Sequence, residues 1–206
     1  MRSIEQRPRL RLGRAAREPR WRLGTTLTHG ALEAGVADWL HDADSLTKRL
    51  RQACPGRFRV ALLGQRWARP MRCERRLLGL DDRALALVRQ VHLYCGDEVV
   101  VFARTVLPAS LLGSRYRYLA RLGGKPLGEV LFRDRSMRRS EVELARIEAR
   151  RSIYAPLLPQ RGDGVIWGRR SLFRLGGQPL LVSELFVPPL PHLPSHRFRV
   201  TRKSGR

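Results

Sequence analysis

Alternating apolar and polar positions along the chain predict two antiparallel hairpins. Residues 85–95 carry apolar side chains at almost every second position, and a Gly-Asp turn leads into a second apolar run at 99–107. Residues 164–175 and 180–187 repeat the arrangement around a Gly-Gly-Gln-Pro turn. Many of the intervening positions in the first run are apolar as well, so both faces of that strand are expected to be covered.

Weaker patterns supply the remaining elements. Residues 58–67 are typical of a strand, and residues 141–150 favour a strand over a helix by a small margin. Helices are expected at 31–40, at 45–53 with Asp44 or Ser45 as N-cap, at 110–122 and at 127–132. Because long crossovers between parallel strands are mostly missing, the pattern predicts a single α+β domain built on one antiparallel sheet.

The composition is that of a folded domain. The chain has 206 residues, of which 43% are apolar and 29% charged, and a chain of this size needs neither a disulfide nor a metal to fold. Its longest apolar stretches are roughly six residues, against about 20 needed to span a bilayer, so no membrane span is expected. The arginine-rich start lacks the apolar stretch of a secretory signal, and the expected location is cytoplasmic.

The net charge of +23 raises the alternative of a nucleic-acid-binding protein. Only three of the 41 basic residues are lysines, so 38 are arginines, a bias that GC-rich coding produces without any selection for partners. Nearly half of the excess lies in a basic N-terminal extension, residues 1–24, and a basic C-terminal tail, residues 192–206. We expect flexible tails that bind polyanions weakly and without specificity, around a domain at residues 25–191.

The usual signatures of metal and nucleotide enzymes are missing from the sequence. There is no P-loop, no Gly-rich dinucleotide fingerprint and no pair of cysteines or histidines at zinc spacing, so the sequence does not favour a metal-dependent or nucleotide-dependent enzyme. Cys54, Cys73 and Cys95 form an odd set without CxxC spacing, and we expect them to be reduced and structural.

Charged residues inside apolar strands are the strongest chemical signal. Arg89 lies between Leu87 and Val91 on one strand face, and Glu184 shares its face with Val182 and other apolar residues. An isolated charge there is costly. Either Arg89 and Glu184 pair with each other or lie at an edge, or they line a pocket in which arginine holds a substrate carboxylate and Glu184 transfers a proton or orients a hydroxyl.

Arg104 extends this pattern. It shares its face with Val100, Phe102 and Val106, on the strand that is expected to pair with the strand of Arg89. We therefore expect Arg104 to be an additional anion contact beside Arg89.

Five segments resemble the bacterial chorismate pyruvate-lyases of ubiquinone biosynthesis, in that family's order and at about its spacing. They are DSLTKRL (44–50), LVRQVHLYC (87–95), ARTVLP (103–108), LGGKPLGEVLF (122–132) and WGRRSLFRLGGQPLLVSELFVP (167–188). The last segment, with WGRRS followed by a Gly-Xaa-Pro-Leu-Leu turn and ELF, is the most specific to the family. The resemblance covers roughly residues 30–190 and neither basic tail.

This resemblance implies a single-domain chorismate lyase-like fold, a six-stranded antiparallel sheet with helical flaps over an internal ligand cavity. It implies a lyase that eliminates pyruvate from chorismate to give 4-hydroxybenzoate, the first step of ubiquinone biosynthesis, without a cofactor, and we expect a monomer.

The family's ligand-binding and catalytic positions fall on Arg89 and Glu184, with further contacts at Leu127 and at Leu46, where the family commonly has methionine. Arg104 or Arg169 would assist Arg89 in binding carboxylates.

The alternative is a non-catalytic small-molecule sensor domain of the same fold. Regulators of that type carry an N-terminal helix-turn-helix, whose apolar pattern the first residues of this chain lack.

Overall fold

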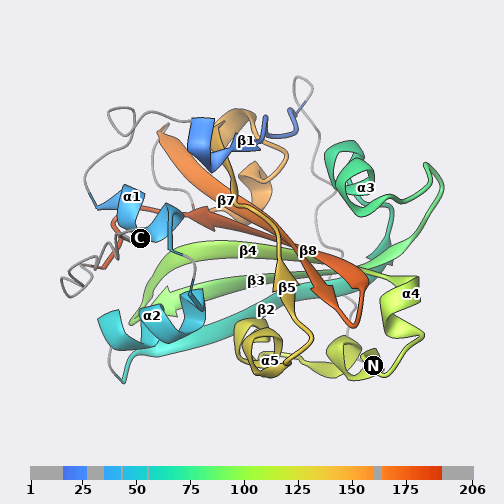
Figure 1. The fold of residues 1–206 in the computed structure, drawn as a ribbon. Helices are drawn as coiled ribbons and strands as arrows, with labels where there is room; N and C mark the ends of the chain where they lie inside the picture. Colours follow the sequence, from blue (N-terminus) through green and yellow to red (C-terminus); the bar gives the residue numbers. More distant parts are fainter. Residues whose placement is uncertain (1–15, 27–34, 43, 55, 160–163, 192–206) are drawn as a thin grey trace, which may run out of the picture.

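An antiparallel sheet runs through the computed structural model, which describes residues 16–26, 35–42, 44–54, 56–159 and 164–191 (Figure 1). Within these residues the strand order is β1-β6-β7-β8-β4-β3-β2, and β5 pairs with β7 beside this path. The strands are β1 (Arg22–Leu23), β2 (Phe58–Ala68), β3 (Ala86–Cys95), β4 (Glu98–Pro108), β5 (Arg138–Arg139), β6 (Glu143–Glu148), β7 (Val165–Leu175) and β8 (Gln178–Phe186).

Short helices connect and cover the strands. They are α1 (Val36–Leu40), α2 (Leu46–Ala53), α3 (Arg72–Leu78), α4 (Ala109–Leu112) and α5 (Leu127–Arg133), with 3-10 turns η1 (Gly24–Thr26), η3 (Arg117–Arg121), η4 (Ala149–Arg151) and η5 (Ala155–Leu157). Among the described residues no helix is long and apolar enough to cross a bilayer. The α+β class and the antiparallel sheet predicted from the sequence are confirmed.

The sheet has eight strands in the described residues, not the expected six. All six predicted strands are present as β2, β3, β4, β6, β7 and β8, each close to its predicted bounds. The two additional strands, β1 and β5, have two residues each. A segment of that length contains no repeating pattern, so alternation cannot reveal it.

The helix predictions are correct for 45–53 and 127–132 and partly wrong elsewhere. In place of one helix at 110–122, α4 ends before Gly113 and η3 follows. The Ser114 hydroxyl donates to the Leu111 carbonyl at 2.6 Å and accepts from the Tyr116 amide at 3.3 Å, and such local bonds compete with helix continuation. Helix α3 was not predicted, and of the helix at 31–40, residues 31–34 lie outside the described residues.

Contacts of the domain begin before residue 25. Strand β1 pairs with β6, and Arg17 forms a bridge to Ser152. The Glu18 carboxylate accepts hydrogen bonds from the amides of Arg72 and Cys73, at 2.9 and 3.0 Å, at the start of α3. Residues 17–24, which were assigned to the N-terminal extension, are therefore structural parts of the domain. Residues 1–15 and 192–206 lie outside the described part of the chain.

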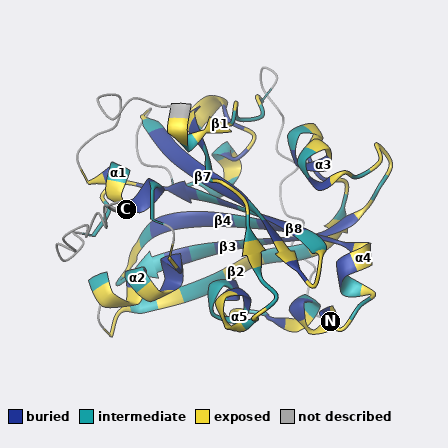
Figure 2. Ribbon diagram, viewed as in Figure 1, coloured by how far each residue is buried: buried dark blue, intermediate teal, exposed yellow. Residues whose placement is uncertain are grey.

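Two apolar clusters cover opposite ends of one sheet face, the face that carries Arg89. At one end α1 and α2 pack on the strands through Trp39, Leu50 and neighbouring side chains. At the other end α4, η3 and α5 pack through Leu111, Leu119 and their neighbours. Figure 2 shows β4 and much of β3, β7 and β8 buried, whereas the helices combine buried and exposed residues. The opposite face of the sheet is covered by α3 and the η4–η5 segment.

Cys54 and Cys95 form a disulfide, with their Cα atoms 5.5 Å apart, whereas we had expected reduced thiols. Cys54 is the C-cap of α2, and Cys95 ends β3 opposite Phe58, so the pairing of β2 with β3 brings the two cysteines together. The absence of CxxC spacing does not argue against a disulfide between cysteines that are 41 residues apart in the sequence. Cys73 is the free cysteine of the described residues, and burial raises the pKa of its thiol to about 12.

The disulfide predicts a redox-dependent stability. A cross-link closing a loop of 41 residues stabilises a protein by about 4 kcal/mol, mainly by restricting the unfolded chain. We expect Cys95→Ser to lower the free energy of unfolding in urea by up to this amount, and dithiothreitol to lower that of the wild type equally. Cys73→Ser is the matched control and should change little. A wild type that is insensitive to dithiothreitol and as stable as Cys95→Ser would contradict the disulfide.

Candidate active site

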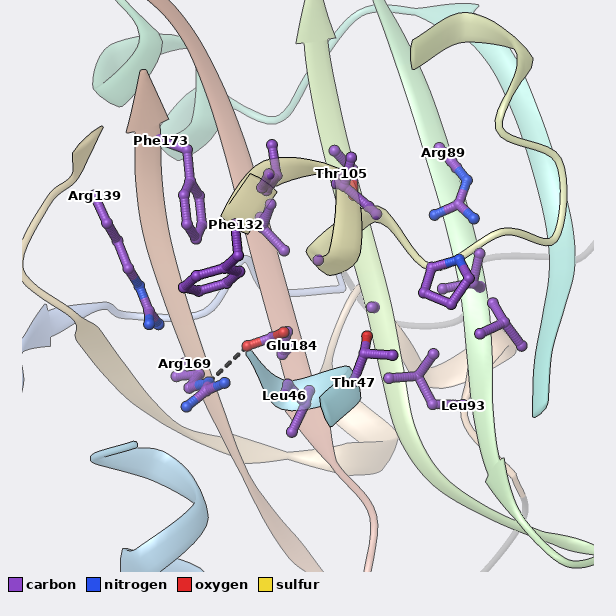
Figure 3. Close-up of a pocket in the computed structure, with 18 of the residues that line it drawn as sticks. Leu46, Thr47, Arg89, Leu93, Thr105, Phe132, Arg139, Arg169, Phe173 and Glu184 are labelled. Carbon is purple, nitrogen blue, oxygen red and sulfur yellow. Dashed lines mark hydrogen bonds and ion pairs between the residues drawn. The ribbon is translucent and has the colours of Figure 1, made fainter. Parts of the chain in front are cut away.

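A pocket lies between the two apolar clusters, with strands β3, β4, β8 and β7 on one side and helices α2 and α5 on the other (Figure 3). Most of its wall is apolar. The apolar side chains that line it include Leu46, Val60, Val91, Leu93, Leu127, Leu131, Phe132, Phe173 and Val182. The polar side chains that line it are Asp44, Thr47, Arg89, Thr105, Arg139, Arg169 and Glu184. An apolar cavity with a few convergent charges is typical of a small-molecule site.

The first turns of α2 and α5 meet above the strands. The Ser45 hydroxyl caps α2 by accepting from the Lys48 amide at 3.5 Å, and Pro126 precedes α5. A Cβ atom on Gly128 would lie 3.1 Å from the Ser45 hydroxyl oxygen, so the two helices approach each other closely at this position. An ion pair between Arg51 and Glu129 joins the two helices further along.

Leu46 and Leu127 are the first residues of α2 and α5, and both are buried and line the pocket. The amide of a residue at the start of a helix has no acceptor within the helix. At both predicted contact positions the chain therefore offers the pocket an apolar side chain and a main-chain amide without a partner in its own helix.

Arg89 is almost completely buried, with 2% of its surface exposed. Its Nη2 donates to the carbonyls of Gly123 and Lys125 at 2.8 and 2.9 Å, while Nε has no hydrogen-bond partner. Among the described residues no carboxylate forms an ion pair with it. Burial therefore lowers the pKa of this guanidinium. The pocket thus contains a buried cation whose hydrogen-bond partners, within the described part of the chain, are carbonyl oxygens.

Glu184 lies at the other end of the pocket and pairs with Arg169. The Arg169 Nε donates to a Glu184 carboxylate oxygen at 2.6 Å, and its Nη1 donates to the carbonyls of Trp39 and Asp42 at 2.8 Å each. Arg169 is 1% exposed. These bonds fix Glu184 and connect strand β7 to the end of α1.

The simpler alternative, a salt bridge between Arg89 and Glu184, is not formed. Arg89 faces Thr105 across β3 and β4, and Thr105 faces Val182 on β8, two residues before Glu184. At a strand spacing of about 4.8 Å and a rise of about 3.4 Å per residue, this places their Cα atoms roughly 12 Å apart. The two charges line one pocket at separate positions and do not pair with each other (Figure 3).

Arg104 does not line this pocket, contrary to the expectation that it lies beside Arg89. It faces Gln90 across the hairpin, so its side chain projects from the opposite sheet face. There its Nε and Nη2 bond both oxygens of buried Glu74, at 2.7 and 3.0 Å. Burial lowers the pKa of Arg104, but the pairing with Glu74 outweighs it and raises the pKa overall. The side-chain pattern had indicated a buried charge without indicating on which face.

Sequence reasoning missed Arg139 and Thr105, which also line the pocket. Arg139 belongs to the two-residue strand β5, which has no detectable pattern. Thr105 lies on the pocket face because it is the cross-strand partner of Arg89. The register of the predicted hairpin would have been enough to identify it. The described residues contain no group of three His, Cys, Asp or Glu side chains that could hold a metal ion.

The fold is shared with domains of known structure. The C-terminal domain of PhnF has a TM-score of 0.53 at 12% identity, over 75% of this chain and 94% of that one. The C-terminal domain of the histidine utilization repressor from Pseudomonas syringae has a TM-score of 0.50 at 14% identity, over 69% of this chain and 99% of that one. At these identities the likeness shows the fold alone.

The sequence carries a closer relationship. Residues 17–193 match the family described as chorismate lyase, and the chain belongs to that family. A relative from Methylococcus capsulatus, named "Probable chorismate pyruvate-lyase", is 42% identical over 77% of this chain and 98% of its own length. A relative of the same name from Thiobacillus denitrificans is 42% identical over 74% of this chain and 82% of its own length.

Proposed function

We propose that the protein is a chorismate pyruvate-lyase that converts chorismate into 4-hydroxybenzoate and pyruvate, the first step of ubiquinone biosynthesis. The observation that carries this proposal is the buried guanidinium of Arg89, which faces an apolar pocket without a carboxylate partner in the described residues. A ligand carboxylate at its unpaired Nε would supply the missing negative charge. Family membership supports the choice of substrate.

The reaction requires few catalytic groups from the protein. Elimination breaks the bond between a ring carbon and the ether oxygen, the ring loses a proton and becomes aromatic, and the released enolpyruvyl group gains a proton to become pyruvate. Since aromatisation of the ring provides much of the driving force, positioning and one proton transfer are sufficient. We expect no cofactor to take part.

Two residues divide the work in this proposal. Arg89 holds the ring carboxylate at one end of the pocket, and Glu184 acts at the other end, on the ring hydroxyl or on the departing ether oxygen. Arg169 fixes the Glu184 carboxylate through the 2.6 Å bond, so that Glu184 can act from a constant position. The apolar wall between them matches the face of a six-membered ring.

Helices α2 and α5 would act as flaps over an internal ligand cavity. They contribute Leu46 and Leu127 from above the strands, and the ligand would be enclosed between these residues and the sheet. Burial of this kind predicts slow release of 4-hydroxybenzoate.

The direct test incubates the purified protein with chorismate and follows the absorbance of 4-hydroxybenzoate. We expect product without added metal or cofactor. A small-molecule sensor domain of the same fold, or a nucleic-acid-binding protein, would bind a ligand without producing 4-hydroxybenzoate, and a clean protein that forms none contradicts the proposal.

Arg89→Ala should lower kcat/KM by about 3 kcal/mol or more, over 100-fold, because it removes a buried charge-assisted pair with the substrate. Arg66→Ala, which changes an exposed arginine on β2, is the matched control and should leave kcat/KM nearly unchanged. Turnover near the wild-type level in a folded Arg89→Ala protein would rule out Arg89 as the substrate anchor.

Glu184→Gln separates the two roles left open for this carboxylate. If Glu184 transfers a proton, turnover should disappear while 4-hydroxybenzoate still binds in a calorimetric titration. Equal loss of turnover and of product binding would assign Glu184 to binding or structure. Glu143→Gln is the control, because Glu143 pairs with Arg170 and does not line the pocket.

A further inference from the structure

The proposed substrate carries two carboxylates, and the proposed ring product keeps one. Arg89 accounts for the ring carboxylate. The second carboxylate belongs to the enolpyruvyl group, whose ether oxygen leaves from a ring carbon beside the hydroxyl. If Glu184 acts on either of these oxygens, the second carboxylate must lie at the Glu184 end of the pocket. A charge buried there requires a cation.

Arg169 is ion-paired with Glu184, and its Nε and Nη1 already have hydrogen-bond partners. Nε bonds Glu184, and Nη1 bonds the carbonyls of Trp39 and Asp42. Moving Arg169 toward a substrate would break a buried ion pair and leave two carbonyls without their donor. Its geometry suits a positioning residue for Glu184 better than a substrate contact.

Arg139 reaches the same end of the pocket from β5. Its Nε donates to the Ser171 hydroxyl at 3.0 Å, and its guanidinium carbon lies 5.3 Å from the centre of the Phe173 ring. Ser171 and Phe173 follow Arg169 on β7 at alternate positions, so all three share one strand face. Figure 3 shows the Arg139 side chain extending past Phe173 with its guanidinium toward Arg169. These contacts hold the side chain at the pocket wall.

Arg139 lies close to a second guanidinium at this end of the pocket. Arg169 is paired with Glu184, and Asp44 is the other carboxylate among the lining residues. Burial and the nearby charge of Arg169 lower the pKa of Arg139, while Glu184 and Asp42 act in the opposite direction. A carboxylate arriving beside Arg139 would relieve the repulsion between the two guanidinium groups.

We propose that Arg139 is a further substrate-binding residue, whose guanidinium binds the carboxylate of the enolpyruvyl group while Arg89 binds the ring carboxylate. This assignment rests on the proposed function. Arg139 then distinguishes the substrate, which has two carboxylates, from the retained ring product, which has one. It also explains how the pocket can hold the departing group in place during elimination.

Substrate and product affinities test the assignment separately. For Arg139→Ala we expect kcat/KM for chorismate to fall by about 10- to 100-fold, mostly through a higher KM, as loss of a hydrogen-bonded charge pair predicts. The inhibition constant of 4-hydroxybenzoate should change less than about threefold, because the product does not reach Arg139 in this account. Arg138→Ala, an exposed neighbour on the same strand, should leave both values unchanged.

Two results would overturn the role of Arg139. One is an unchanged KM for chorismate, and the other is an equal loss of affinity for chorismate and for 4-hydroxybenzoate. If Arg139→Ala does not fold, Arg139→Gln keeps an amide donor near the position of Nε for Ser171 but removes the guanidinium, and it gives the same two readouts. Failure of the proposed function is seen separately, since the wild-type protein would then form no 4-hydroxybenzoate at all.

Discussion

A buried positive charge without a carboxylate partner is the constraint on which this structure depends. Arg89 lies in the middle of β3, 2% exposed, with only carbonyl oxygens as hydrogen-bond partners among the described residues. Those carbonyls belong to the segment between η3 and α5, so the same guanidinium that faces the pocket also fixes the chain that leads into a covering helix. An uncompensated cation in an apolar environment is costly, and a bound carboxylate reduces this cost. We regard the incomplete pairing of Arg89 as the basis of ligand binding.

The rest of the architecture keeps the two charged ends apart. Core clusters at both ends of one sheet face leave a gap between them, and the pocket lies in that gap. Cross-strand register places Arg89 and Glu184 two strands apart, and Arg169 forms an ion pair with the Glu184 carboxylate. Arg169 gives Glu184 a cationic partner other than Arg89. The ion pair on β7 and β8 therefore allows an arginine and a glutamate to face one cavity without neutralising each other.

Much of the fold, and part of the pocket, could be predicted from the sequence, because long strands with alternating side chains are visible in it. The six long strands, the Ser45 cap and the unusual positions of Arg89 and Glu184 all follow from local patterns. The features that were predicted wrongly or missed depend on contacts between segments that are distant in the sequence. Arg104 has the same apolar surroundings as Arg89, and only the register shows that it faces the opposite side. Arg139 lies in a strand too short to have a period, and the Cys54–Cys95 bond joins an α2 end to a β3 end through tertiary packing. The roles of Arg89, Glu184, Leu46 and Leu127 remain predictions.

A crystal structure of the protein with 4-hydroxybenzoate tests the central claim most directly. The account predicts that the product lies between β4 and the α2–α5 pair, with its carboxylate on the Nε side of Arg89 and its hydroxyl beside Glu184. A product molecule bound elsewhere, or bound in this pocket with its carboxylate away from Arg89, would contradict it.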